Sequence, residues 1–316
     1  LGLSMFCTAG VSFHYHSLDF DAFIKSGSVT TISGLILWFY KFSTSATVNK
    51  REGYLIVAVG WLFLGLFGAL PFYISGVTPL FTDAFFESVS GFTTTGASIF
   101  NDIESLPQGI LFWRSLTHWI GGMGIIVLTV ALFPLLGIAG IELFVAESPG
   151  PTADKVHPRI KETAKRLWFI YFGLTMTLFF LLWWQGMSLF DAINHAFATM
   201  GTGGFSTKNA SIAHFTSSGI QYTIILFMFI AGCNYAVLYY LFKGRFSKVW
   251  INEEFRYYAL FILLTSLILG LWINYMVGGS YEKNFRDGLF MLVSLVTTTG
   301  FVTADYTQWS PGLTMF

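Results

Sequence analysis

DAFFESVSGFTTTG, at residues 83–96, has two counterparts in this chain: DAINHAFATMGTGG at residues 191–204 and DGLFMLVSLVTTTG at residues 287–300. In each, an Asp begins an apolar run that is too short to cross a bilayer, and a Thr/Gly-rich turn follows at the same distance. Internal repetition indicates one structural unit used several times. A half-length helix followed by extended backbone leaves carbonyl groups unpaired, and a membrane tolerates this only where they line a water-filled or ion-filled path. The repeat therefore predicts an ion pore.

The composition is that of an integral membrane protein. The 316 residues are 54% hydrophobic and 19% aromatic, and 11% are charged. Stretches long enough to cross roughly 30 Å of hydrocarbon are expected at residues 23–42, 54–74, 111–136, 167–186, 219–242 and 257–277. The apolar run 1–13 reads as the tail of a further helix and not as a signal peptide, because it lacks a basic segment and a small-residue cleavage site.

The distribution of Lys and Arg predicts the orientation of the chain. The formal net charge is zero, so overall charge favours no partner, and we expect no nucleic-acid partner. Most basic residues fall in three loops that alternate with the repeated segments. By the positive-inside rule these loops are cytoplasmic and the repeated segments are external. The loop residues are Lys41, Lys50, Arg51, Lys155, Arg159, Lys161, Lys165, Arg166, Lys243, Arg245, Lys248 and Arg256.

The predicted fold is an all-α membrane protein built from repeated helix–pore-loop–helix units, as in potassium channels, with extra N-terminal helices. The expected parts are N-terminal transmembrane helices at 1–52, a first pore repeat at 53–137, a cytoplasmic linker with a second repeat at 138–242, and a linker with an incomplete third repeat at 243–316. A fourth repeat is absent from this sequence. We expect either that the sequence is part of a longer chain or that another molecule supplies the missing wall.

The composition of the turns suits a filter for cations. Backbone carbonyls can replace the hydration shell of a permeating ion, Gly allows close approach and dihedral angles closed to other residues, and Thr adds a hydroxyl that can anchor the turn. The half-helix before each turn directs its C-terminal dipole end, which favours cations, toward the centre. The expected ion-binding residues are Thr94, Thr95, Gly96, Thr202, Gly203, Gly204, Thr298, Thr299 and Gly300.

Four carboxylates are candidates for supporting the filter. Asp83, Asp191 and Asp287 are expected near the N-termini of the half-helices, where a carboxylate can cap free N–H groups. Glu87 is an intramembrane carboxylate and therefore a candidate functional residue. Its position behind the first turn suits bracing of the filter and attraction of cations equally well.

The turns FTTTGAS, TMGTGGFST and TTTGFVTADY, together with the stretch at residues 135–168, resemble the Trk/Ktr/HKT superfamily of potassium transporters, and most closely its bacterial TrkH/TrkG membrane subunits. The resemblance implies a fourfold pseudo-symmetric pore in the bacterial inner membrane, assembled as a homodimer. It also implies a cytosolic nucleotide-binding ring, similar to TrkA, that docks on the basic loops. A Gly at position 96 goes with potassium preference in that superfamily. The superfamily's intramembrane gate and its pore-facing Arg belong to segments that this sequence does not contain, so no gating residue can be assigned.

Several other residues favour structural roles. We expect Arg114 and His118 to lie near the outer end of a helix, satisfied by their neighbours. His195 aligns with Glu87 and Met291, so no symmetric ring of ionisable groups forms. The glycines at 121, 122 and 124 are expected to allow close helix packing, and Asn234 to hydrogen-bond across helices or to line an inner cavity. Cys7 and Cys233 are expected to be buried free thiols.

The sequence therefore predicts the pore subunit of a potassium uptake system, with potassium as substrate and the lipid bilayer as its surroundings. No nucleophile–base pair, metalloprotease motif or phosphate-binding loop is recognisable, so we expect neither an enzyme nor an organic cofactor. Two alternatives remain open. One is a sodium-permeable or sodium-coupled relative, and the other is a non-conducting membrane scaffold or regulatory subunit.

Overall fold

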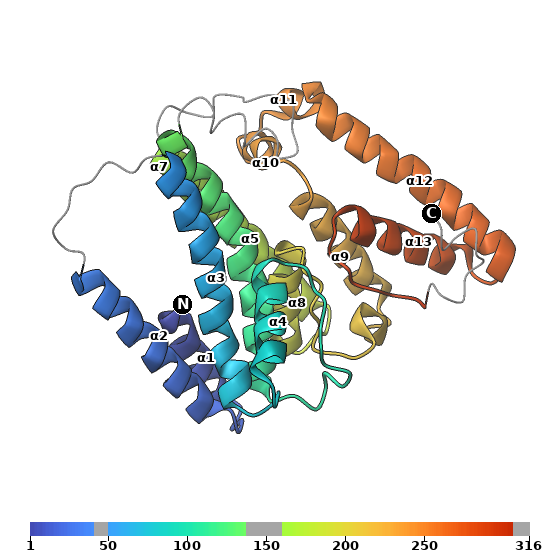
Figure 1. The fold of residues 1–316 in the computed structure, drawn as a ribbon. Helices are drawn as coiled ribbons and strands as arrows, with labels where there is room; N and C mark the ends of the chain where they lie inside the picture. The colour runs from blue at the N-terminus through green and yellow to red at the C-terminus, as the bar shows by residue number, and fades with distance from the viewer. Residues whose placement is uncertain (41–49, 137–159, 306–316) are drawn as a thin grey trace.

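The computed structural model describes residues 1–40, 50–136 and 160–305, and every regular element within those ranges is a helix (Figure 1). The basic residues Lys41, Lys155 and Arg159, and most of the stretch 135–168, lie outside the described residues. Four of the described helices are long and apolar enough to cross a membrane. They comprise Phe20–Tyr40, Arg51–Ile74, Lys165–Trp184 and Glu253–Met276.

Two helices, α1 (Gly2–His14) and α2 (Phe20–Tyr40), form an N-terminal pair. They pack closely because Gly27 leaves room for the ring of Phe6. The turn between them also holds the next unit, since the buried carboxylate of Asp19 accepts a 2.7 Å hydrogen bond from the N–H of Ile110 at the start of α5. A carboxylate at this position satisfies a free N–H group and complements the helix dipole.

The first pore unit consists of α3 (Lys50–Ile74), the short α4 (Phe81–Phe92) and α5 (Gln108–Leu136). Small residues set how closely these helices approach. A Cβ atom on Gly68 of α3 would overlap Phe92 and Ser88 of α4, and one on Gly121 of α5 would overlap the backbone of Phe92. The close packing predicted for Gly121 therefore brings α5 directly against the C-terminal end of α4.

The second unit contains α7 (Ile160–Trp184), α8 (Leu189–Met200), the 3₁₀ turn η1 (Ser211–His214), α9 (Ser218–Ala231) and α10 (Tyr235–Phe242). The prediction of one continuous helix over 219–242 is wrong, because the helix is interrupted between Ala231 and Tyr235. A Cβ atom on Gly232 would lie 2.8 Å from Tyr258 and from Thr297. The side chain of Asn234 donates to Glu254 on α12 across 3.4 Å, so its predicted role in interhelical hydrogen bonding agrees with the structure.

The third unit contains α11 (Phe246–Ile251), α12 (Glu253–Val277) and α13 (Tyr281–Val296), and α13 packs against both α12 and α9 (Figure 1). Asn252 caps α12 by accepting a 2.8 Å hydrogen bond from the N–H of Phe255. Helix α13 begins at Tyr281, six residues before the expected start of the half-helix at Asp287. The third short helix is therefore longer than its two counterparts.

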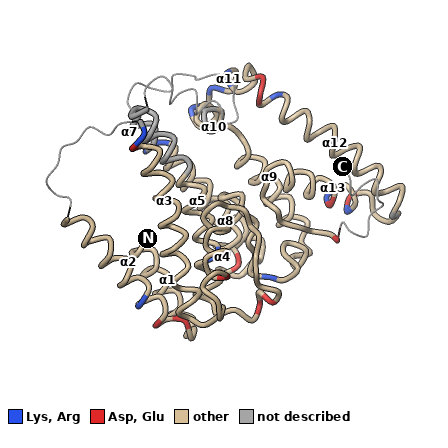
Figure 2. Tube along the Cα trace, viewed as in Figure 1, with Lys and Arg blue, Asp and Glu red and all other residues tan. Residues whose placement is uncertain are grey.

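The surface fits a membrane protein with charged ends. Large apolar side chains such as Trp184 and Leu271 are exposed on the long helices, as lipid contact requires. Lys and Arg residues gather around α10, α11 and the start of α7, at the upper end of the view in Figure 2. Cys7 and Cys233 are free, and Cys7 lies on an exposed helix face, contrary to the expectation that both are buried.

Candidate functional site

The three Thr/Gly turns have the same backbone conformation. Thr94, Thr202 and Thr298 have φ angles of 55°, 52° and 56°. The glycine two positions later in each turn, Gly96, Gly204 or Gly300, has a φ of 76°, 77° or 81°. Left-handed backbone is a genuine outlier for a β-branched residue, and strained residues of this kind cluster at functional sites. One unusual conformation, built three times, marks these turns as the candidate site.

Each turn is tied to the helix that precedes it. The N–H of Thr94 donates to Gly91 O across 3.1 Å, and the N–H of Thr95 donates to Ser90 O across 2.9 Å. The second and third turns repeat both hydrogen bonds at the equivalent positions. Among the described residues, no hydrogen bond ends on the carbonyl oxygen of Thr94, Thr202 or Thr298. The carbonyl groups at the helix ends thus accept hydrogen bonds from the N–H groups of the turns. The carbonyl oxygens of Thr94, Thr202 and Thr298 remain available to a ligand.

The turns also lie against one another. A Cβ atom on Gly96 would overlap the carbonyl oxygen of Gly203, and one on Gly204 would overlap the carbonyl oxygen of Thr299. Gly300 has no atom of a described residue within 4 Å of the equivalent position. The first turn therefore contacts the second and the second contacts the third, at distances that only glycine permits.

Hydroxyl groups brace the first and third turns. Thr93 and Thr95 are joined by a 2.8 Å hydrogen bond between their hydroxyls, and Thr297 and Thr299 by another of 2.8 Å. In addition, Ser90 donates to Ala97 O across 2.6 Å, and Ser294 donates to Phe301 O across 2.8 Å. The second repeat has Gly201, Gly203 and Ala198 at the positions of these threonines and serines. Sequence reasoning missed the serines, although their constant distance from the repeat Asp was visible.

Glu87 braces the segment that follows the first Thr/Gly turn. It is fully buried, and both carboxylate oxygens are used. Oε1 accepts hydrogen bonds from Ser98 Oγ at 3.0 Å and Arg114 Nε at 2.8 Å, while Oε2 accepts from the N–H of Ile99 at 3.0 Å. Of the two readings left open for Glu87, these contacts match the bracing role. Arg114 is satisfied by neighbours as expected, but it is 2% exposed and does not lie at the surface.

His195 occupies the place of Glu87 in the second repeat. Its Nε2 lies 2.9 Å from Ser206 Oγ, and its Nδ1 lies 2.7 Å from Asp191 O. Ser98 and Ser206 follow Glu87 and His195 at the same distance in sequence. In the third repeat the two positions hold Met291 and Val302, which cannot form such a bond. A polar brace to the segment after the turn is thus present in two repeats, with a carboxylate in the first and an imidazole in the second.

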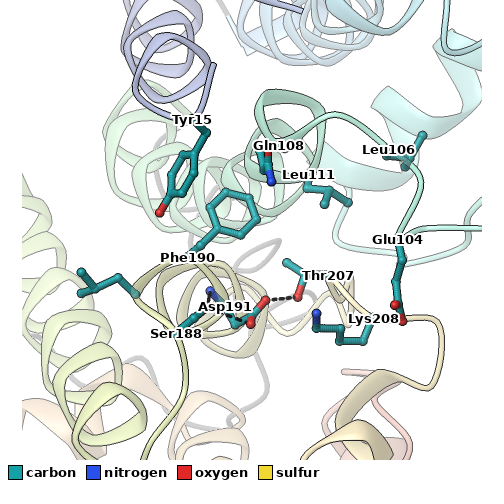
Figure 3. A pocket seen from close by; sticks show the side chains of 11 residues that line it. Tyr15, Glu104, Leu106, Gln108, Leu111, Ser188, Phe190, Asp191, Thr207 and Lys208 are labelled. Carbon is teal, nitrogen blue, oxygen red and sulfur yellow. Dashed lines mark hydrogen bonds between the residues drawn. The ribbon is translucent and has the colours of Figure 1, made fainter. Parts of the chain in front are cut away.

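The three repeat aspartates have different surroundings. Asp83 is in the first turn of α4, whose N-cap, Leu80, makes no side-chain capping bond. Asp191 is the third residue of α8 and pairs with the N-cap Ser188, whose hydroxyl accepts from Asp191 N at 3.0 Å and donates to Asp191 Oδ2 at 2.8 Å (Figure 3). Asp191 Oδ1 also accepts from Thr207 Oγ1 at 2.6 Å, which ties the segment after the second turn to α8.

The expectation that Asp287 caps a half-helix is wrong. Because α13 begins at Tyr281, Asp287 lies within the helix and is buried. Its neighbour Thr303 stands at the same distance in sequence as Thr207 does from Asp191. Asp287 is therefore beside the segment that follows the third Thr/Gly turn and not at the start of the helix.

The loops that follow the first and second Thr/Gly turns are joined by one side chain. Asn209 Oδ1 accepts from the N–H of Ile103 at 2.6 Å, and its Nδ2 donates to Asp102 Oδ1 at 2.9 Å. The N–H of Asn209 donates to Glu104 Oε1 at 3.1 Å. Next to this junction is a cavity of about 380 Å³ between α1, α5 and α8 (Figure 3), lined by Tyr15, Glu104, Leu106, Gln108, Leu111, Ser188, Leu189, Phe190, Asp191, Thr207 and Lys208.

The sequence is similar to a family of known proteins. The profile of a family described as "TrkH: Cation transport protein" matches residues 19–316. The chain is 46% identical over 293 residues to the Trk system potassium uptake protein TrkH of Escherichia coli (strain K12), covering 91% of this chain and 60% of that protein. It is 32% identical over 310 residues to the Trk system potassium uptake protein TrkG of the same strain, covering 97% of this chain and 64% of that protein.

A solved structure gives the same result for the fold. The crystal structure of the potassium transporter TrkH from Vibrio parahaemolyticus matches with a TM-score of 0.87 and 36% sequence identity, covering 99% of this chain and 65% of that chain. The predicted all-helical membrane fold of repeated pore units is thereby confirmed. The chain spans about three fifths of the length of the relatives that it matches.

Proposed function

Because the chain belongs to the TrkH family of cation transport proteins, we propose that it forms the first three quarters of a potassium uptake pore. The observation that carries this proposal is the identical backbone of the three turns, with left-handed Thr and Gly at the same positions. Transport of a cation, and no catalysis, is the function of such a chain. The names of its relatives, potassium uptake proteins and a potassium transporter, support potassium as the substrate.

The proposed ion sites are the backbone oxygens of Thr94 to Gly96, Thr202 to Gly204 and Thr298 to Gly300. A dehydrating cation needs several oxygens at fixed positions. Turns whose N–H groups are bonded to their own helices can supply these oxygens without a change of conformation. Transport inward follows the membrane potential, which contributes about 2.3 kcal/mol per charge per 100 mV. Glu87, Asp83, Asp191 and Asp287 would support the turns and not bind the ion directly.

The organisation of the whole protein is part of the proposal. The chain divides into N-terminal helices at 1–52 and pore repeats at 53–137, 138–242 and 243–316, within a bacterial inner membrane. The basic loops face the cytoplasm and the filter turns face outward, in keeping with the positive-inside rule. The whole protein is a homodimer regulated by a cytosolic nucleotide-binding ring that binds the basic loops. The "Trk system" in the relatives' names, which points to several components, supports such a partner.

Cation flux into proteoliposomes containing the full-length protein tests this proposal. We expect uptake of potassium and rubidium in preference to sodium, and loss of that preference in Gly96→Ser. The matched control is Gly76→Ser, because Gly76 has a φ of 75° against 76° for Gly96 but no atom of the described residues within 4 Å of its Cβ position. Preferential sodium uptake by the wild type would favour the sodium-permeable alternative, and absence of any flux would favour the scaffold.

A further inference from the structure

The second filter turn lacks the side chains that brace the other two. In the first and third turns, the hydroxyls of Thr93 and Thr297 each donate to a carbonyl of the preceding helix across 2.7 Å and also bond a second threonine of the turn. The equivalent positions in the second turn are Gly201 and Gly203, which have no side chains. An otherwise identical backbone must therefore be held there by something else.

Helix α5 of the first repeat fills the space. A Cβ atom on Gly203 would overlap the imidazole ring of His118, and one on Gly201 would overlap the backbone of His118. The ring is fully buried and stacks on Phe205, with centroids 4.0 Å apart and planes 18° apart. Within the described part of the chain, neither ring nitrogen of His118 has a hydrogen-bond partner. The imidazole therefore acts here through its shape and its stacking.

Arg114 lies one helical turn before His118 and contacts the same segment. Its guanidinium carbon is 4.1 Å from the centroid of the Phe205 ring, and its Nη1 donates to Ser206 O across 3.3 Å. A guanidinium over an aromatic face gains both stacking and cation–π attraction. Helix α5 thus supports the residues directly after Gly204 with one charged and one aromatic side chain.

The same guanidinium also holds the first repeat. Arg114 Nε donates to Glu87 at 2.8 Å, and Nη2 donates to Ser98 Oγ at 3.1 Å. Ser98 and Ser206 are equivalent positions, each two residues after the filter glycine of its repeat. One buried side chain therefore fixes the exits of two neighbouring filter turns relative to each other. A buried ion pair is costly unless it is fully hydrogen-bonded. Here Glu87 and Arg114 each make further hydrogen bonds besides the one that joins them.

We propose that Arg114 and His118 are positioning residues for ion selectivity, with His118 replacing the missing threonines of the second turn and Arg114 setting its distance from the first. This inference rests on the proposed function, because its readout is selective cation flux. Ion selectivity depends on carbonyl positions, and functional groups have to be held to within about 0.5 Å by the residues around them. Loss of either side chain should therefore alter selectivity more than it alters the amount of folded protein.

The role of His118 can be tested by exchanging the two kinds of support. Gly203→Thr alone should abolish selective flux, because the new side chain overlaps His118. Adding His118→Ala should restore selective rubidium uptake, since Thr is the residue found at the equivalent positions 95 and 299. His118→Phe keeps a ring and should retain the wild-type rubidium-to-sodium ratio, whereas His118→Ala alone should lower it. If Gly203→Thr is selective without the second change, or His118→Ala alone leaves the ratio intact, the role of His118 is refuted.

The role of Arg114 can be tested with a substitution that keeps its charge. Arg114→Lys can still pair with Glu87 but cannot contact Ser98, Ser206 and Phe205 together. The rubidium-to-sodium uptake ratio should fall by about 10- to 100-fold, the usual effect of losing a residue that orients ion ligands. Arg286→Lys is the matched control, because Arg286 is also buried and bonds Gln221 at 2.8 Å, but it lies eleven residues before Thr297 and its hydrogen bonds go to Gln221 and Glu282, not to a turn.

The outcomes separate the two proposals. If the wild type takes up no cation selectively, the proposed function fails. If the wild type is selective and folded Arg114→Lys keeps the same ratio, the inference about Arg114 is overturned. If Arg114→Lys does not fold, the neutral pair Glu87→Gln with Arg114→Gln replaces it, and an unchanged ratio in that pair overturns the inference equally.

Discussion

Substitution of Gly204 by Ala tests whether the three Thr/Gly turns need glycine for their close contacts or only for its backbone flexibility. Gly204 has a φ of 77°, and its added Cβ atom would lie against the carbonyl oxygen of Thr299 in the next turn. Gly76, in the turn after α3, has a φ of 75°, and no atom in the described part of the chain lies within 4 Å of its Cβ position. The two positions have nearly the same positive φ and differ in their surroundings, so Gly76→Ala is the control.

The structure gives the size of both effects. Left-handed backbone costs a residue with a Cβ atom about 1–2 kcal/mol, and both variants bear this cost. In Gly204→Ala the Cβ atom also lies inside the roughly 3.3 Å at which carbon and oxygen normally meet, so the Thr299 carbonyl must move by about 1 Å. Overpacking of this kind typically costs a further 1–3 kcal/mol. A shift of about 1 Å also exceeds the ~0.5 Å tolerance of a preorganised site.

Two assays on the full-length protein distinguish the variants. Thermal unfolding in detergent should show a small loss of stability for Gly76→Ala and a larger one for Gly204→Ala. Rubidium and sodium uptake into proteoliposomes should be unchanged in Gly76→Ala, whereas Gly204→Ala should lose uptake or its preference for rubidium. Equal stability and unchanged selectivity in the two variants would refute the reasoning, because the contact between the second and third turns would then be irrelevant.

Two further predictions concern the contacts around the site. Gly121→Ala should reduce the yield of folded protein, because its Cβ atom would overlap the backbone of Phe92. Gly124→Ala should be tolerated, because its Cβ atom would make an ordinary 3.5 Å contact with Trp61. Equal size-exclusion profiles for the two variants would contradict this prediction. The amide of Asn209 lowers the pKa of Asp102 in the loop between the first turn and α5. The bond between them therefore stabilises the loop above the unfolded pKa of about 3.9 and is lost as pH falls through the lower, folded pKa. Asn209→Ala should raise the pKa of Asp102 in a carboxyl NMR titration, and an unmoved pKa would count against the bond.

The sequence was most informative where the chain repeats. The constant spacing from Asp83, Asp191 and Asp287 predicted three equivalent turns, and their φ angles agree to within a few degrees. The same spacing aligned Glu87 with His195, and both contact the serine two residues after the glycine of the turn. The repetition is visible in the sequence because each unit ends a short helix in the same kind of turn, with unpaired carbonyl groups, and this turn requires Thr and Gly at fixed positions.

Features set by contacts between units could not be read from the sequence. Hydropathy is continuous over residues 219–242, so the interruption at Gly232 is visible only once Tyr258 and Thr297 are seen to pack against it. The early start of α13 follows from the turn at Gly278 and Gly279, with φ angles of 70° and 92°, before the polar residues that open the helix. Patterns based on apolar periodicity miss such a start.

The support of the second turn was missed for the same reason. Arg114 and His118 belong to the first repeat in sequence, but their side chains contact residues of the second repeat. A signal was nonetheless present, since Gly201 and Gly203 replace residues that are threonine in both other turns. A missing side chain at a repeated position indicates that another segment fills its place, although the sequence does not say which one.

The most direct measurement is the position of a bound permeant ion. Crystals of the full-length protein grown in rubidium should show anomalous density bounded by the carbonyl oxygens of the three turns, at Thr94 to Gly96, Thr202 to Gly204 and Thr298 to Gly300. Replacing rubidium by sodium should remove it. Anomalous density elsewhere in the protein, with none at the turns, would contradict the account that these turns bind the permeating ion.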